Sequence, residues 1–134
     1  MLLQRFGNTE NMDILIEKYC KDTWRSLKVF RHSGTVKQFS KQFFQEIRFE
    51  SERLLTINLY QEHKYKTLIQ TNKWNIGFVN RKHFLNIEEK PAYEIITLNH
   101  ADLVLGNPVT HEKIFFARLP AWENFMNQGI TYAL

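Results

Sequence analysis

The chain has 134 residues, the length of a single domain, and 43% of them are hydrophobic, which is enough to build a core. With only 5 Gly and 3 Pro residues, the composition excludes collagen-like and low-complexity chains. The formal net charge is +4, but the basic residues are scattered, so we expect no nucleic-acid partner. We therefore expect residues 1–134 to form one globular domain.

Cys20 is the single cysteine, so the chain cannot form an internal disulfide, which fits the reducing cytoplasm. No apolar stretch approaches the ~18 residues that a membrane helix needs, so we expect no membrane insertion. Residues 1–7 are too short and polar for a signal peptide.

Taken in chain order, the first predicted element is a short helix over residues 12–19, where apolar side chains recur at helical spacing after Asn11 or Asp13 as a cap. From Thr23 the pattern changes to the alternation that is typical of half-buried strands. Strands are predicted around residues 27–30, 43–50, 55–60, 65–69, 74–78, 84–87, 93–98, 103–105 and 113–118.

Turn-forming residues separate these strands, at Ser33-Gly34, 51–53, 71–73 and 106–108. Pro91 cannot donate to a ladder, so residues 88–91 are expected to break the sheet. After Pro120, residues 121–128 again show helical spacing and end before Gly129. This last helix packs on the outside of the sheet, covers a barrel mouth as a lid, or forms a dimer contact.

About eight or nine strands at ~10-residue spacing, with no long helices between them, predict an all-β fold. We expect an antiparallel up-and-down β-barrel with short amino- and carboxyl-terminal helices. Its apolar strand faces either fill the interior or line a hollow pocket. The candidate ligand-binding residues on these faces are Phe43, Ile47, Phe49, Leu55, Ile57, Leu59, Trp74 and Ile76.

Polar side chains on the same strands, such as Gln45 and Tyr65, are candidates to orient a ligand head group. Arg48 takes the interior position instead if the register is shifted by one residue, because such a slip reverses every face.

Three segments resemble the lipocalin-like barrels of the calycin group, in particular the small bacterial lipocalin-like domains. They are Asp22-Thr23-Trp24, residues 93–105, and the strand Ile114-Phe115-Phe116-Ala117-Arg118. The resemblance covers roughly residues 19–119. Asp22 departs from it, because lipocalins usually have Gly two residues before this Trp. The resemblance implies that Trp24 and Arg118 pack together and close one end of the barrel.

No motif for catalysis, for a cofactor or for phosphate binding occurs, so we expect neither an enzyme nor a cofactor. His111-Glu112 lacks the second histidine of a zinc helix motif, so no metal site is expected. The histidines, His32, His63, His83, His100 and His111, are expected mostly in solvated loops, with an inward-pointing haem or metal ligand as the alternative.

Glu46 and Glu50 share a strand face but lie roughly 13 Å apart, too far to act on one bond, so a solvated face is expected. The leading expectation for function is therefore non-catalytic carriage or sensing of a small hydrophobic ligand inside the barrel, by a monomer or a homodimer. The alternative is a filled barrel that acts as a protein-interaction or structural module.

Overall fold

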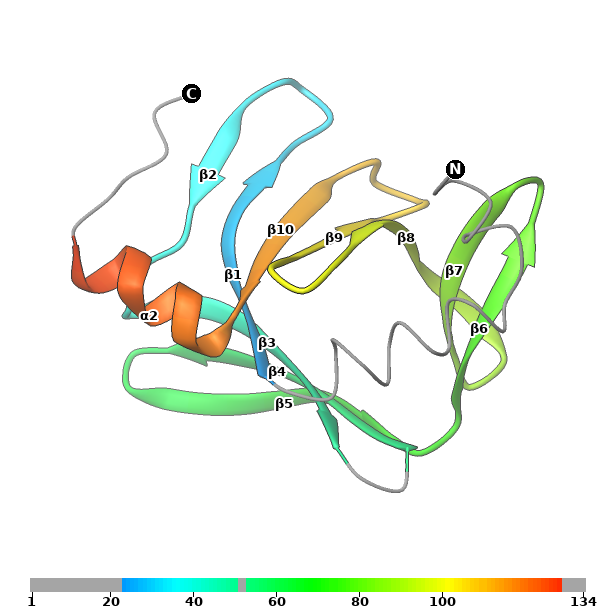
Figure 1. Cartoon of the computed structure of the whole chain (residues 1–134), viewed down its shortest axis with the longest axis horizontal. Helices are drawn as coiled ribbons and strands as arrows, with labels where there is room; N and C mark the ends of the chain where they lie inside the picture. The colour runs from blue at the N-terminus through cyan, green and yellow to red at the C-terminus, as the bar shows by residue number, and fades with distance from the viewer. Residues whose placement is uncertain (1–22, 51–52, 129–134) are drawn as a thin grey trace.

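The structure is a computed structural model that describes residues 23–50 and 53–128. These residues form one curled antiparallel sheet and one short helix (Figure 1). In chain order the strands are β1 (Thr23–Phe30), β2 (Val36–Gln38), β3 (Phe43–Glu50), β4 (Leu54–Gln61), β5 (Lys64–Thr71), β6 (Trp74–Val79), β7 (Lys82–Ile87), β8 (Lys90–Leu98), β9 (Asp102–Gly106) and β10 (Lys113–Arg118), and helix α2 (Leu119–Asn127) follows.

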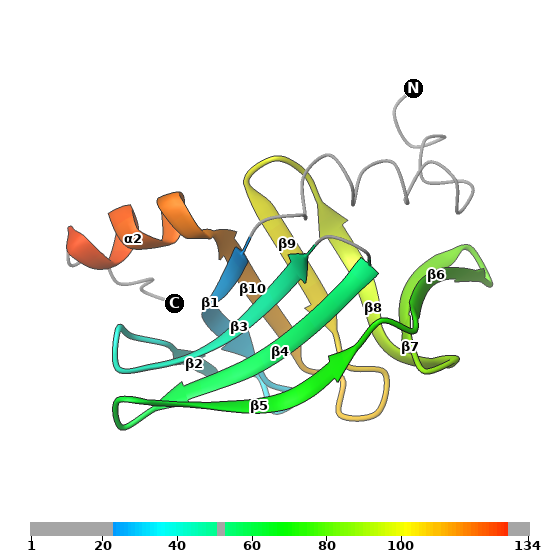
Figure 2. The ribbon, with the colours of Figure 1, turned by 90° about the horizontal axis from the view of Figure 1, so that it is seen from below.

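The sheet has an up-and-down order, since nearly all neighbouring strands are also consecutive in the chain. The order is β5-β4-β3-β1-β10-β9-β8-β7-β6, and the short strand β2 pairs with β1 beside this path. The pairing of β1 with β10 joins the first strand in the chain to the last one. This confirms the predicted all-β antiparallel class and gives a curled half-barrel (Figure 2).

The half-barrel stays open between two strands that follow each other in the chain. Strands β5 and β6 form the two ends of the sheet, and no ladder joins them within the described residues. The end of β5 and the β5–β6 connection are tied to the β7–β8 turn, because the hydroxyl of Thr71 donates to Glu88 at 2.7 Å and the Lys73 carbonyl accepts a backbone hydrogen bond from Glu88.

Three hairpins turn over only two residues, each with positive φ at both positions. The turns are Glu62-His63, Asn80-Arg81 and Glu88-Glu89. This geometry matches the right-handed twist of the flanking strands. It also corrects the prediction for residues 88–91, because only Glu88-Glu89 leave the ladder. Pro91 lies at the start of β8 beside a register shift, where a missing N–H is tolerated.

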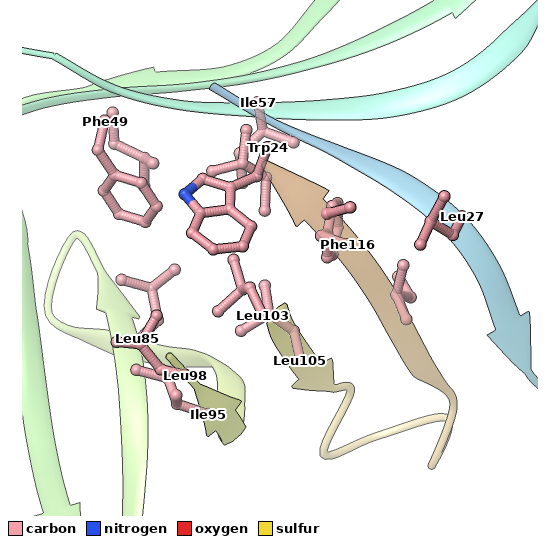
Figure 3. Close-up of a cluster of buried hydrophobic side chains, with 14 of the residues drawn as sticks. Trp24, Leu27, Phe49, Ile57, Leu85, Ile95, Leu98, Leu103, Leu105 and Phe116 are labelled. Atoms are coloured by element: carbon pink, nitrogen blue, oxygen red, sulfur yellow. The ribbon is translucent and has the colours of Figure 1, made fainter. Parts of the chain in front are cut away.

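The concave side of the sheet holds the part of the hydrophobic core that is drawn in Figure 3. Trp24 is fully buried at the centre, with Phe49, Ile57 and Leu103 around it. The side chains come from both halves of the sheet, so burying them is what curls it. Arg48 lies on the opposite side with half of its side chain exposed, so the shifted register is wrong.

Helix α2 confirms the predicted carboxyl-terminal helix and packs on the convex side of the sheet. Its Trp122 is buried, contacts Phe44 and donates its indole N–H to the carbonyl of Ser26 at 2.9 Å. The predicted helix over residues 12–19 and Cys20 lie outside the described residues. No helix in the described part of the chain is long and apolar enough to cross a membrane.

Candidate functional site

Seven of the eight predicted ligand-binding residues lie in the hydrophobic core or pack against it, and Leu59 is the exception. The register of β3 and β4 places Ile47 opposite Ile57 and Phe49 opposite Leu55. These side chains therefore lie on the faces that the alternation predicted. Six of the eight are buried, whereas Phe43 and Leu59 are half-buried. Their role in binding remains a prediction.

Two buried indole groups stand out in this apolar region. The Nε1 atoms of Trp24 and Trp74 are buried and have no hydrogen-bond partner among residues 23–50 and 53–128. A buried donor without an acceptor costs ~1–3 kcal/mol, so such groups are rare in folded proteins. The ring of Phe49 packs edge-on against Trp74, with centroids 5.3 Å apart. The core therefore presents two unused donors among apolar side chains.

A cation lies directly beside the second indole. The Arg53 guanidinium sits 4.2 Å from the centre of the Trp74 ring, and its Nη2 donates to the Trp74 carbonyl at 3.4 Å. Such a cation–π contact fixes the guanidinium while leaving other donors available. Arg53 was not among the predicted site residues, because it lies in the predicted turn over residues 51–53.

Two further polar residues face the concave side. His83 is buried on β7, between Phe78 and Ile95 across the ladders, which corrects its expected place in a solvated loop. Tyr93 lies opposite Leu85, and burial raises the pKa of its phenol, which keeps the hydroxyl protonated. The signal for both was present, since each alternates with apolar core residues of its strand.

The other histidines are exposed. His32 and His111 meet at the ends of β1 and β10, with ring centres 5.4 Å apart, and His63 lies in a two-residue turn. No group of three or more metal-binding side chains occurs among the described residues.

Trp24 and Arg118 are direct cross-strand partners on β1 and β10. Arg118 Nη1 donates to the carbonyl of His100 at 3.2 Å, so its guanidinium ties the β8–β9 turn to the last strand. The register thus brings the predicted pair together at one end of the sheet, while its stacking remains a prediction.

The convex side carries a polar network that the sequence analysis did not predict. Glu46, expected on a solvated face, is 3% exposed. It pairs across the ladder with Arg25, whose Nε lies 2.9 Å from Glu46 Oε2, and it accepts from Asn58 Nδ2 at 3.4 Å. Asn58 in turn accepts from the Thr67 hydroxyl at 2.9 Å. This carboxylate is buried because cationic and amide donors surround it.

Tyr65 belongs to this convex network and not to the barrel interior. A register shift between Ile57 and Asn58 pairs them with Ile69 and Thr67, so β5 contains an extra residue at Leu68. Such a bulge reverses the faces on one side of it. Tyr65 therefore lies opposite Tyr60, and its hydroxyl accepts from Arg25 Nη2 at 3.2 Å.

Four aromatic rings flank the network beneath helix α2. Phe44 is stacked on Tyr60 at 4.9 Å and meets Trp122 edge-on at 4.8 Å, and Tyr60 contacts Tyr65 at 4.8 Å. The Arg25 guanidinium lies 4.6 Å from the Phe44 ring and 4.9 Å from the Trp122 ring. Arg25 therefore joins the aromatic rings to the Glu46 network.

Two hollows open on this convex side, and Arg25 and Tyr65 line both. One, of about 380 Å³, has an aromatic floor and is bordered by Lys41, which bonds Asn127, and by Glu123. The other, of about 330 Å³, is polar and is lined by Glu46, Arg48, Asn58 and Thr67 among others.

Comparisons with protein families, with curated proteins and with solved structures find no match to this chain, so the residues and their geometry carry the functional argument.

Proposed function

We propose that this protein binds, without chemical change, a small and mostly apolar molecule that carries an oxygen acceptor, on the concave side of its half-barrel. The observation that carries the proposal is the pair of buried indole N–H groups, of Trp24 and Trp74, for which the described part of the chain provides no acceptor. A ligand oxygen would satisfy a donor that folding leaves unpaired. Apolar burial would supply most of the affinity, at ~25 cal/mol per Å² before ordering costs.

Arg53 favours an acidic head group over a neutral one. Its guanidinium is held over the Trp74 ring, beside one of the two unused donors. Hydrogen bonds between a guanidinium and a carboxylate are about twice as strong as those between neutral groups. A fatty-acid-like molecule therefore fits the chemistry of this region.

A lipocalin-like identity is part of the same proposal. The up-and-down antiparallel order and the curled half-barrel are compatible with a calycin-like fold. Trp24 opposite Arg118 at the end of β1 and β10 agrees with the pair that the resemblance implies. Small barrels of this kind hold one ligand inside.

The first test is native mass spectrometry of the purified full chain, followed by denaturing extraction of any released compound. The stripped protein is then titrated by calorimetry with dodecanoate and with dodecylammonium, which have the same tail but opposite heads. We expect dodecanoate to bind and dodecylammonium to bind far more weakly. Equal binding of both refutes the acceptor requirement, and binding of neither, with no extracted compound, refutes the function.

Two substitutions locate the site. Trp74→Phe keeps an aromatic ring but removes the donor, which costs ~1 kcal/mol of binding, or about fivefold in affinity. Trp122→Phe on the convex side is the matched control and leaves dodecanoate affinity unchanged.

A second candidate is a protein-interaction module, which the open edges of the sheet favour. Among the strands that the structure describes, none pairs with the outer edge of β5 or β6, and Leu68 and Val79 on these two strands are exposed. Unpaired edges of this kind invite pairing with another chain. A dimeric mass in the same native experiment that Leu68→Lys abolishes would support this candidate.

A further inference from the structure

We propose that the convex side holds a second, separate site, which binds a small anion that carries a planar ring. We call it the outer groove and define it as the two hollows that share Arg25 and Tyr65 as walls. It lies on the opposite side of the sheet from Trp24, so it does not depend on the function proposed above.

A network of hydrogen bonds forms the polar half of the outer groove. Glu46 is held by Arg25 at 2.9 Å and by Asn58 at 3.4 Å, and Asn58 is held by Thr67. The Glu46 side chain is 4% exposed, so its charge is turned away from solvent and satisfied by its partners. The carboxylate therefore fixes the guanidinium of Arg25 and is not an open acid that would repel an anion.

Arg48 supplies the available cation. Its Nε lies 3.9 Å from Glu46 Oε1, which is an ion pair without a close hydrogen bond, and its side chain is 51% exposed. A guanidinium has five donors in a planar fork that matches carboxylate and phosphate. The charged side chains that line the two hollows are Arg25, Lys41, Arg48, Glu46 and Glu123, so the outer groove has a net positive charge.

The aromatic half supplies the surface for a ring. Phe44 and Trp122 form a buried floor, Tyr60 is half-buried, and Tyr65 is 52% exposed with its hydroxyl held by Arg25. Because its ring contacts Tyr60 and its hydroxyl accepts from Arg25, Tyr65 loses less conformational freedom on stacking than an unrestrained side chain would. Planar rings stack on such side chains with a contribution that tolerates differences in ring chemistry.

The two halves together select one ligand class. Each hollow has the volume of a small-molecule pocket, about 380 Å³ for the aromatic one and about 330 Å³ for the polar one. A molecule whose ring lies against Tyr65 and whose anionic group reaches Arg48 uses both. Nucleoside monophosphates and aromatic carboxylates share this chemistry.

The test is calorimetric titration of the full chain at low ionic strength with four probes. Adenosine 5′-monophosphate and indole-3-acetate carry both features, adenosine carries the ring alone, and inorganic phosphate carries the charge alone. We expect at least one of the two ring anions to bind, and the ring alone or the charge alone to bind at least about tenfold more weakly. The ring anion that binds distinguishes a phosphate source from a carboxylate source.

Two substitutions and one control place the binding in the outer groove. Arg48→Gln and Tyr65→Leu should each lower the affinity for the ring anion by about tenfold. Arg81→Gln, in the exposed turn between β6 and β7, should leave this affinity unchanged. Melting curves confirm that all three variants are folded. Equal binding of adenosine or of phosphate alone overturns the proposal, as does a failure of either groove substitution to weaken binding. The absence of binding by both ring anions up to about 5 mM overturns it as well.

Discussion

Replacing Trp24 by Ala tests the central role given to this residue in the core. Trp24 is 0% exposed and is surrounded by side chains from both halves of the sheet (Figure 3). Burying a large aromatic side chain removes ~150–250 Å² from water, which at ~25 cal/mol per Å² sets a ceiling of about 4–6 kcal/mol. Observed Trp-to-Ala losses in cores are ~3–5 kcal/mol.

The unpaired indole N–H lowers this expectation. The substitution also removes a buried donor without an acceptor, and that relief offsets ~1 kcal/mol or more of the loss. We therefore expect Trp24→Ala to lower the free energy of unfolding by about 3 kcal/mol. For a chain of this length that corresponds to a fall in Tm of roughly 9–15 °C.

The assay is urea and thermal unfolding followed by far-ultraviolet circular dichroism. Val109→Ala is the matched control, because Val109 is 83% exposed and surface substitutions usually stay within ~0.5 kcal/mol. A Tm shift for Trp24→Ala no larger than that of the control would refute the assignment of Trp24 as the centre of the core.

Three further predictions concern other parts of the molecule. Glu46→Gln leaves Arg25 without its charge partner and should cost ~1.5–3 kcal/mol in urea unfolding, and the double variant with Arg25→Gln should cost less than the two single losses added together. Burial raises the pKa of Tyr93 above the 10.0 of a free phenol, so its contribution to stability is complete below pH 10 and is lost as the pH rises further. Absorbance at ~295 nm should show late ionisation, and Tyr93→Phe should remove part of it, because burial also raises the pKa of Tyr65. Gly34 has a φ of +92° in the β1–β2 turn, so Gly34→Ala should destabilise the fold by ~1 kcal/mol in the same unfolding assay; an unchanged midpoint would contradict this.

Alternation in the sequence was sufficient to predict which side chains of β3 and β4 face the concave side, because successive side chains of a strand point to opposite faces. Ile47 and Phe49 on β3, and Leu55 and Ile57 on β4, therefore lie where the pattern placed them. The two-residue turns were harder to recognise. Glu62-His63 and Glu88-Glu89 both have positive φ, yet neither contains the glycine or asparagine that usually marks this geometry.

The convex network could not be predicted from alternation alone. Glu46 follows the polar side of β3, so the pattern indicated a solvated carboxylate. Its burial depends on Arg25, which is opposite in the ladder but 21 residues away in the chain. The side of the sheet on which Tyr65 lies depends on a bulge at Leu68, and no residue type in this segment indicates a bulge. Pairings between distant segments thus decide which polar residues form a site.

Adjacent residues of strand β1 belong to the two proposed sites, because successive side chains of a strand point to opposite faces of the sheet. Trp24 points into the core and Arg25, its neighbour, joins the network on the other side of the sheet. Because the sheet lies between them, a substitution confined to one side should leave binding on the other side intact. Trp74→Phe should weaken the binding of dodecanoate but not that of the ring anion. Tyr65→Leu should weaken the binding of the ring anion but not that of dodecanoate. A substitution that weakens both ligands would show that the sites are coupled through the sheet, since affinities of independent sites do not affect each other.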